Sequence, residues 1–333
     1  MSAISAHKLS KRLLGLFANQ QIILLVVLLA IVVFFTINNP IFFSNSVFAN
    51  ILLDWAPLTL IAVGETFVII SGGIDLSVGA VTGFSGIIAA FVMRDLTHMM
   101  WGETATLLIG VLVTVAVGAG LGLINGILIT ATRLVPFVAT LVMLGAAGGL
   151  SIVLTGGAPI GDGPVNAILL TVPIFGPFSI PVIIVVVITV YLGLVLHLSR
   201  FGRYTYATGS NSFAALVAGI NVNRHLVKIY MLSGMLAGLA GMFFYIRLAS
   251  GAPTSGLNSE LDAIASVVIG GAALSGGVGV LSGTVLGALI LTTITSGLII
   301  IGVAPDWKQV VVALLIAFAV LAQSLRLTNR SAS

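Results

Sequence analysis

Residues 21–38 read QIILLVVLLAIVVFFTIN and contain no charged side chain. A helix needs about 20 mostly apolar residues to cross the hydrocarbon core of a bilayer. The rest of the chain continues this pattern, because 59% of its 333 residues are hydrophobic and 7% are charged, where a soluble domain carries roughly 25%. A mean hydropathy of +1.25 leaves too few polar residues to cover a water-soluble core. The sequence predicts an all-α polytopic membrane protein and excludes a soluble enzyme, a nucleic-acid-binding protein and a disordered chain.

Charged residues and Pro/Gly breaks divide the chain into about ten candidate transmembrane helices. They cover roughly 21–38, 50–71, 76–93, 105–130, 136–155, 180–197, 228–248, 261–274, 280–302 and 309–325. The eighth is short enough to be a broken or re-entrant helix. No A-x-A cleavage site follows the first apolar run, which favours an uncleaved span over a signal peptide. We therefore expect a single transmembrane domain over 1–333, with an N-terminal tail 1–20, a long loop 198–227 and a C-terminal tail 326–333.

The distribution of Lys and Arg predicts the orientation in the membrane. Lys8, Lys11 and Arg12 precede the first span, which places the N-terminus in the cytoplasm. Ten spans return the C-terminus to the same side, where the basic loop 198–227 also lies. The outer loops 39–49, 156–179 and 249–260 contain no Lys or Arg. The three tryptophans, Trp55, Trp101 and Trp307, are all expected at the outer interface, where indole rings prefer to lie.

A glycine-rich turn occurs twice in the chain. Residues 72–79 (GGIDLSVG) and 270–277 (GGAALSGG) share the pattern GGxxLSxG, and each follows an apolar stretch. Adjacent glycines allow unwound backbone, and broken helices at corresponding places of two halves point to a transport pathway. The pattern predicts two broken-helix GG turns in a pseudo-repeat. The broken-helix and pathway candidates are Glu65, Ser71, Gly72, Gly73, Asp75, Ser77, Gly270, Gly271 and Ser275.

Two of these candidates are acids inside apolar sequence, where ionisable residues usually indicate function or pairing. For Asp75 we favour a local role, in which its carboxylate accepts N–H groups at the start of the following helix. For Glu65, a role in the pathway and a buried hydrogen bond remain equally open. Glycines spaced by four residues, such as Gly118/Gly122/Gly126 and Gly234/Gly238, predict close helix packing, and contacts within one subunit are favoured over a dimer contact.

The sequence contains little that indicates enzyme chemistry. It has no cysteine, no HExxH and no P-loop, so neither a metal site nor an ATPase site is expected in this chain. Gly83-Phe84-Ser85-Gly86 has the GxSG form found around the serine of rhomboid proteases, but short glycine-rich matches of this kind are weakly specific. We expect a non-enzymatic protein without a cofactor of its own.

The long loop contains a further element. Phe213 to Ala218 is predicted as a short helix, with Ser210 or Ser212 as its N-cap and Gly219 as its stop. A short helix that projects from a membrane bundle buries little of its own surface, so we expect it to dock onto a soluble partner.

Three stretches together are similar to a known family. GRYTYATGSNSFAALVAGINVNRHLVKIYMLSG (202–234), SGGIDLSVGA (71–80) and ELDAIASVVIGGAALSGGVGVLSGTVLGALI (260–290) resemble permease subunits of bacterial ABC sugar importers. The similarity covers nearly the whole chain and points to the ribose, galactose, xylose or galactofuranose class. It implies a multi-pass protein of the bacterial inner membrane whose domain 1–333 is a permease domain.

The resemblance also implies partners. These are a cytoplasmic ABC ATPase that binds ATP and Mg, a periplasmic sugar-binding protein, a second permease copy or a sister permease, and the lipid of the membrane; no nucleic acid is expected. The residues that fall on the coupling segment to the ATPase are Tyr204, Ser210, Asn211, Ser212, Phe213, Ala214, Ala215 and Gly219. The alternative from the residues alone is a secondary transporter coupled to protons or sodium through Glu65 or Asp75.

Overall fold

The computed structural model describes residues 20–304, 307, 309–314 and 317. Within these residues the chain forms helices and two isolated β-bridges. The helices are α2 (Gln20–Asn38), η1 (Pro40–Phe43), α3 (Asn45–Ile70), α4 (Val78–His98), α5 (Glu103–Thr132), α6 (Pro136–Thr155), η2 (Val165–Thr171), α7 (Ile180–Leu198), α8 (Arg200–Ser210), α9 (Ser212–Val217), α10 (Val222–Leu248), α11 (Ser259–Ile269) and α12 (Leu281–Ile300). The predicted all-α class is confirmed.

Eight of the described helices are long and apolar enough to cross a membrane. They are α2, α3, α4, α5, α6, α7, α10 and α12, and each corresponds to one of the predicted spans. The predicted span 261–274 is instead the short helix α11 of 11 residues, which fits its interpretation as a broken helix. The predicted span 309–325 lies largely outside the described residues. The polytopic helical architecture is therefore confirmed.

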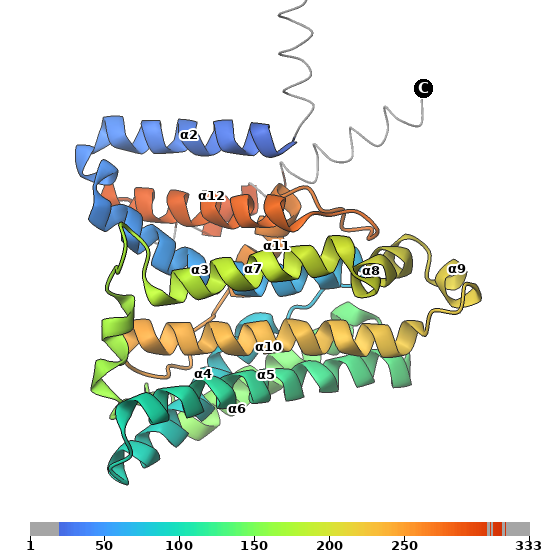
Figure 1. The fold of residues 1–333 in the computed structure, drawn as a ribbon, viewed down its shortest axis with the longest axis horizontal. Helices are drawn as coiled ribbons and strands as arrows, with labels where there is room; N and C mark the ends of the chain where they lie inside the picture. The colour runs from blue at the N-terminus through green and yellow to red at the C-terminus, as the bar shows by residue number, and fades with distance from the viewer. Residues whose placement is uncertain (1–19, 305–306, 308, 315–316, 318–333) are drawn as a thin grey trace, which may run out of the picture.

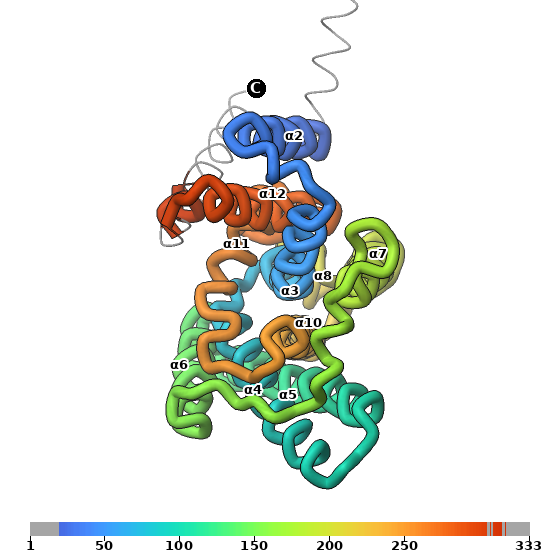
Figure 2. The backbone as a smooth tube through the Cα atoms, turned by 90° about the vertical axis from the view of Figure 1, so that its left-hand side faces the viewer, coloured from blue at the N-terminus to red at the C-terminus, as the bar shows by residue number. Residues whose placement is uncertain are grey.

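The long helices run side by side along one direction (Figure 1). The short helix α9 projects at one end of this bundle, which we call the α9 end. At the opposite end, the segment 156–179 crosses from α6 to α7 over the ends of other helices (Figures 1 and 2). Glu103 Oε2 accepts the Asn166 N–H at 3.1 Å, and Ile160 pairs with Gly251. These contacts fix the crossing segment against the helix ends beneath it.

Helix α10 lies in the middle of the bundle, with α3, α4 and α5 packed around it (Figure 2). Glycines on α5 and α10 make this packing close. A Cβ atom on Gly118 would overlap the Gly234 carbonyl oxygen, and a Cβ atom on Gly122 would overlap the Tyr230 carbonyl oxygen. Small residues let membrane helices approach backbone to backbone. The predicted role of these glycine stripes in packing within one subunit is confirmed.

One of the three tryptophans that were predicted at the outer interface is buried between helices. Trp55 is only 5% exposed, and its indole Nε1 donates to the Val285 carbonyl at 3.2 Å, so its ring lies between α3 and α12. Trp101 and Trp307 are exposed. An indole N–H needs an acceptor when it is buried, and α12 supplies one here, which hydropathy along the sequence does not reveal.

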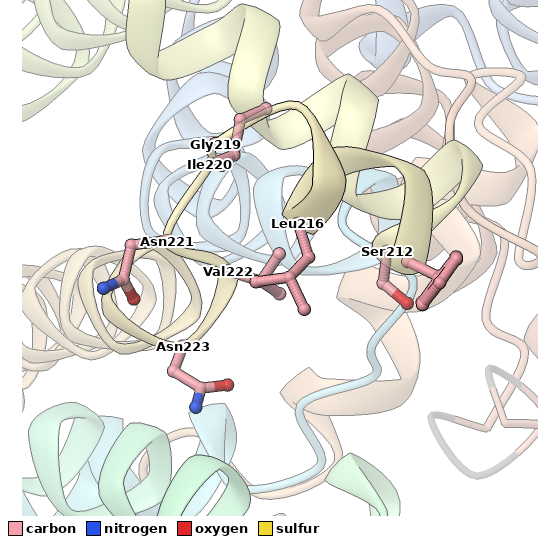
Figure 3. A pocket seen from close by; sticks show the side chains of 8 residues that line it. Ser212, Leu216, Gly219, Ile220, Asn221, Val222 and Asn223 are labelled. Atoms are coloured by element: carbon pink, nitrogen blue, oxygen red, sulfur yellow. The ribbon is translucent and has the colours of Figure 1, made fainter.

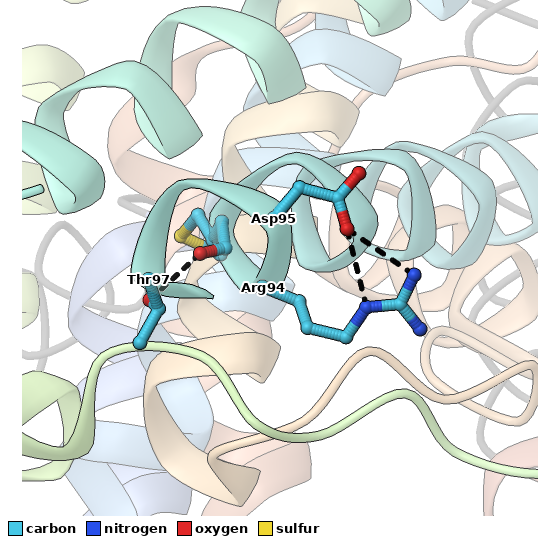
Figure 4. A network of polar contacts seen from close by, with 4 residues as sticks. Arg94, Asp95 and Thr97 are labelled. Atoms are coloured by element: carbon cyan, nitrogen blue, oxygen red, sulfur yellow. Dashed lines mark hydrogen bonds and ion pairs between the residues drawn. The ribbon is translucent and has the colours of Figure 1, made fainter. Parts of the chain in front are cut away.

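The end of α4 opposite the α9 end carries the ion pair of Arg94 with Asp95. Arg94 Nη2 lies 3.3 Å from Asp95 Oδ1, and Thr97 donates to the Met93 carbonyl at 2.8 Å (Figure 4). At the same end Arg247 of α10 pairs with Asp54 of α3 at 2.9 Å. Both pairs are partly exposed, so each contributes little to stability; they balance basic charge at this end.

The close packing of α5 on α10 predicts a sharp difference between two glycines of one helix. Gly118→Ala should destabilise the protein by about 1–3 kcal/mol, because the new methyl group must push α10 away. Gly120→Ala is the matched control, since nothing lies within 4 Å of its Cβ position. Thermal unfolding in detergent, followed by fluorescence-detected gel filtration, measures both. Equal melting temperatures for the two variants would contradict this packing.

Candidate functional site

The first glycine turn ends helix α3. The N–H of Gly72 donates to the Ile69 carbonyl at 2.9 Å, and the N–H of Gly73 donates to the Val68 carbonyl at 3.0 Å. Gly72 has φ of +88°, a conformation that favours glycine. This pair of bonds is the Schellman motif, which satisfies carbonyls that a helix end otherwise leaves free. The predicted break after this span is therefore present.

The second glycine turn ends α11 in the same way, with a shift of one residue. Gly271 donates to the Val268 carbonyl at 2.9 Å, and Ala272 donates to the Val267 carbonyl at 3.1 Å. Gly271, with φ of +96°, is thus the structural counterpart of Gly72. The sequence pattern instead aligns Gly72 with Gly270, because it counts identical letters and does not detect which glycine has positive φ. The repeated turn is confirmed, and its alignment needs this correction.

After the first turn the chain folds back beside α3. The backbone N–H of Asp75 donates to Glu65 Oε1 at 3.1 Å, although Glu65 lies ten residues earlier. The Asp75 carboxylate accepts the Ser77 N–H at 2.9 Å and the Ser77 hydroxyl at 2.6 Å. Helix α4 begins at the next residue, Val78. This is the local role for Asp75 that the sequence favours, and it places the start of α4 beside Glu65, in the C-terminal part of α3.

Side chains from three other helices hold the returning segment. Asn125 of α5 donates to Ser77 Oγ at 2.8 Å, Ser233 of α10 donates to Asp75 Oδ2 at 3.3 Å, and Thr140 of α6 accepts the Leu76 N–H at 3.1 Å. These three residues are missed by the sequence analysis. Asn125 carries the available signal, because it is the one amide in the apolar stretch 105–130.

Glu65 is enclosed in this polar cluster and is 0% exposed. Its Oε1 accepts the Asp75 N–H, while Oε2 has no hydrogen-bond partner among the described residues. The Tyr230 hydroxyl, also without such a partner, lies against Gly73, where a Cβ atom would overlap it. The buried hydrogen bond that was one of the two interpretations of Glu65 is thus present. Glu65, Asp75 and Ser77 are thus all buried within one subunit.

The two turns meet at the α9 end of the bundle. The Gly277 N–H donates to the Ile70 carbonyl at 2.8 Å, and a Cβ atom on Gly276 would lie 3.0 Å from the Gly72 Cα. Ser71 bonds back to the Val68 carbonyl, Gly270 packs on Gly283, and Gly271 packs on the Gln20 side chain. Gly72 and Ser275 are exposed. The candidates on the two turns therefore form one contiguous region.

The predicted short helix in the long loop is α9. Its N-cap is Asn211, whose side chain accepts the Ala214 N–H at 2.9 Å, and not Ser210 or Ser212. Asn is as good an N-cap as Ser, so composition alone does not select between neighbours. Gly219 has φ of +86° and closes the helix with Ile220, as predicted for the stop. The preceding segment, which the sequence left as loop, is the helix α8.

Most of the coupling candidates are exposed. Phe213 is 75% exposed and Val217 is 73% exposed, with Leu216 between them. Tyr204, Ser210, Asn211, Ser212, Ala214 and Gly219 are also exposed, whereas Ala215 is buried. Figure 3 shows the pocket between α9 and the start of α10, which Leu216, Asn221 and Asn223 help to line. The α9 end thus presents exposed apolar side chains next to the side-chain amides of Asn221 and Asn223.

Comparison with known proteins decides what this arrangement belongs to. Residues 47–320 match the family described as "Branched-chain amino acid transport system / permease component". This chain belongs to that permease family.

Individual relatives narrow the comparison. The chain is 38% identical to the ribose import permease protein RbsC of Escherichia coli K12 over 296 residues, which cover 86% of each chain. It is 40% identical to RbsC of Bacillus subtilis over 292 residues, 86% of this chain and 87% of the relative. The galactose/methyl galactoside import permease protein MglC of E. coli K12 is 34% identical over 303 residues, 88% and 90% of the two chains. No solved structure matches.

The contacts of Glu65 in this permease predict different outcomes for two substitutions. Glu65→Gln keeps a carbonyl oxygen that accepts the Asp75 N–H, so transport should stay within about threefold of the unchanged protein. Glu65→Ala leaves that buried donor unpaired, which should cost about 1–3 kcal/mol of stability. Substrate uptake and thermal unfolding measure the two effects.

Glu103 is the control, because its carboxylate also accepts one backbone N–H, from Asn166, but at a partly exposed site. Glu103→Ala should therefore destabilise the protein less than Glu65→Ala. A folded Glu65→Gln protein without uptake would show that the carboxylic acid itself is needed, as an ion-coupled carrier requires.

Proposed function

We propose that the chain is the membrane-spanning permease subunit of an ATP-binding-cassette importer that carries a monosaccharide of the ribose or galactose class. The observation that carries this proposal is its similarity, over 86% or more of both chains, to permeases named for ribose and galactose import. The family description mentions branched-chain amino acids, but these relatives favour a sugar. The same family membership favours an ABC permease over an ion-coupled carrier.

The energy source in this proposal is a partner ATPase that binds ATP and Mg. The support from the structure is α9, whose apolar side chains Phe213, Leu216 and Val217 are exposed at the end of the bundle. Exposed apolar clusters of this kind mark protein interfaces. The basic residues Arg200, Arg203, Arg224 and Lys228 flank α9 in sequence and suit an acidic rim on the partner. The α9 end accordingly faces the cytoplasm, together with both termini.

The remaining partners are a periplasmic sugar-binding protein and a second permease, either a copy or a sister chain. The binding protein delivers sugar at the end of the bundle opposite α9, which then faces the periplasm of a bacterial inner membrane. The pathway forms where two permeases meet, because the polar cluster around Glu65 and Asp75 is enclosed within one subunit. A neutral sugar requires hydroxyl and amide groups with apolar walls and no charged clamp.

The mechanism is alternating access driven from outside the chain. ATP binding closes the partner ATPase, and its movement displaces α9 through the exposed face of that helix. The two glycine turns are the points where the bundle can bend, because each ends a helix with a glycine of positive φ. The sugar then meets a pathway open to the other side.

Purification of the tagged chain from its native host tests this proposal. A co-purifying ATPase that is lost when 210–219 is replaced by a Gly/Ser linker supports it. A chain that purifies alone and transports sugar by itself on an ion gradient contradicts it.

The exposed face of α9 predicts a sharper result for single side chains. The double variant Phe213→Ala/Leu216→Ala should reduce recovery of the ATPase at least tenfold, because large apolar side chains at the centre of an interface carry most of its binding energy. Its thermal stability should not change, since both side chains are exposed. Leu108→Ala/Leu112→Ala on α5 is the control, with side chains that are equally exposed but lie on a membrane-spanning helix. Equal recovery of the ATPase with both double variants would count against α9 as the docking element.

A further inference from the structure

Helix α8 connects the last membrane-spanning turn of α7 to α9 (Figure 1). Ser210 ends α8, and Asn211 is both its C-cap and the N-cap of α9. A single residue therefore separates the two helices, and both of its roles are fixed by hydrogen bonds. A displacement of α9 must move the end of α8 with it, because no flexible linker lies between them.

Helix α8 is also bonded to the segment that follows the second glycine turn. The Tyr206 hydroxyl donates to the Gly279 carbonyl at 2.6 Å. Burial raises the pKa of Tyr206, so the phenol keeps the proton that it donates. Gly279 itself packs against the Ile70 side chain and Ala272. One hydrogen bond thus joins α8 to the backbone between α11 and α12.

The end of α8 also touches the first glycine turn. A Cβ atom on Gly209 would overlap the Ile70 carbonyl oxygen and would lie 2.8 Å from the Gly277 nitrogen. These are the two atoms whose hydrogen bond joins the turns, since Gly277 N–H donates to the Ile70 carbonyl. A Cβ atom on Gly277 would in turn lie 3.2 Å from the Ser210 Cβ. Only glycine at position 209 allows α8 to lie this close to the hydrogen bond between the two turns.

A third contact ties α8 to the chain that leaves α9. Thr205 Oγ1 lies 3.0 Å from His225 Nε2 in the first turns of α10, and the His225 ring packs edge-on against Phe201. Helix α8 is therefore held to α10 as well as to both glycine turns. The contact with α10 would be enough to hold α9 in place. The contacts of α8 with the place where the two turns meet are therefore additional to that role.

We infer that α8 transmits the movement of α9 to both glycine turns at once, with Tyr206 and Gly209 as the positioning residues of this junction. The inference rests on the proposed function, because it assigns the path by which a partner ATPase acts on the bundle. When α8 is displaced, the hydrogen bond from Tyr206 moves the Gly279 carbonyl with it. The same displacement changes the distance between Gly209 and the Ile70–Gly277 hydrogen bond. The ends of α3 and α11 then move together instead of one after the other.

The test uses the complete transporter, with its ATPase and binding protein, in liposomes loaded with ATP. Sugar uptake and ATP hydrolysis are measured on the same preparation, with radiolabelled ribose and galactose as probes. The first variant is Tyr206→Phe, which removes the donor and keeps the ring. Its control is Tyr191→Phe on α7, where the side chain is 63% exposed. The second variant is Gly209→Ala, with Gly193→Ala on α7 as control, because nothing lies within 4 Å of that Cβ position.

We expect Tyr206→Phe to assemble with the ATPase and to hydrolyse ATP normally, since the exposed face of α9 is unchanged. Sugar transported per ATP hydrolysed should fall about fivefold, the factor that one hydrogen bond contributes to an equilibrium. Gly209→Ala should lower this ratio further, and both controls should match the unchanged protein.

Two results would overturn the inference. One is an unchanged ratio of transport to hydrolysis in Tyr206→Phe. The other is loss of ATPase assembly in parallel with transport, which would show that α8 only holds α9 in position. If the unchanged chain does not assemble with an ATPase at all, the proposed function fails first, and that result is visible before any variant is made.

Discussion

A helix that ends inside a membrane protein must have its free backbone groups satisfied by protein, because lipid provides neither donor nor acceptor. This constraint governs the region around the two glycine turns. The carbonyls at the end of α3 are satisfied by Gly72 and Gly73, and those of α11 by Gly271 and Ala272. The N–H groups before α4 are satisfied by Glu65, Asp75 and Thr140. The buried acids are therefore explained first by the need to seal a helix that starts within the bundle.

Two regions of the bundle are held together by different kinds of contact. Around α10, glycines on α5 leave no space between the helices, and Asn125 and Ser233 hold the segment before α4 from both sides. At the α9 end, the two turns touch through one backbone hydrogen bond and a few glycines. Helix α8 contacts the same place through Gly209, so a movement of α8 reaches the ends of both turns directly. This suits a protein that is driven from that end.

The sequence predicts the helical class, the spans and the breaks well, because apolar length and glycine pairs determine them locally. It does not reveal contacts that come from distant parts of the chain. The hydrogen bond from the Trp55 indole to the Val285 carbonyl of α12 joins residues 230 positions apart, and hydropathy does not predict it. Thr140 and Ser233 acquire their roles only because the Leu76 N–H and the Asp75 carboxylate lie within 3.5 Å of their hydroxyl groups. The one-residue shift between the two turns depends on which glycine has a positive φ, and the amino-acid sequence pattern does not show this. The family resemblance, carried by 71–80, 202–234 and 260–290, is what identifies the function.

The most direct test of the central claim, that this bundle is driven by ATP through a partner, is uptake of labelled sugar into liposomes that contain the complete transporter. The account predicts uptake that requires ATP on the α9 side and the binding protein on the other, and that continues after a protonophore collapses the ion gradient. Uptake by the chain alone, without ATP and abolished by the protonophore, would contradict it.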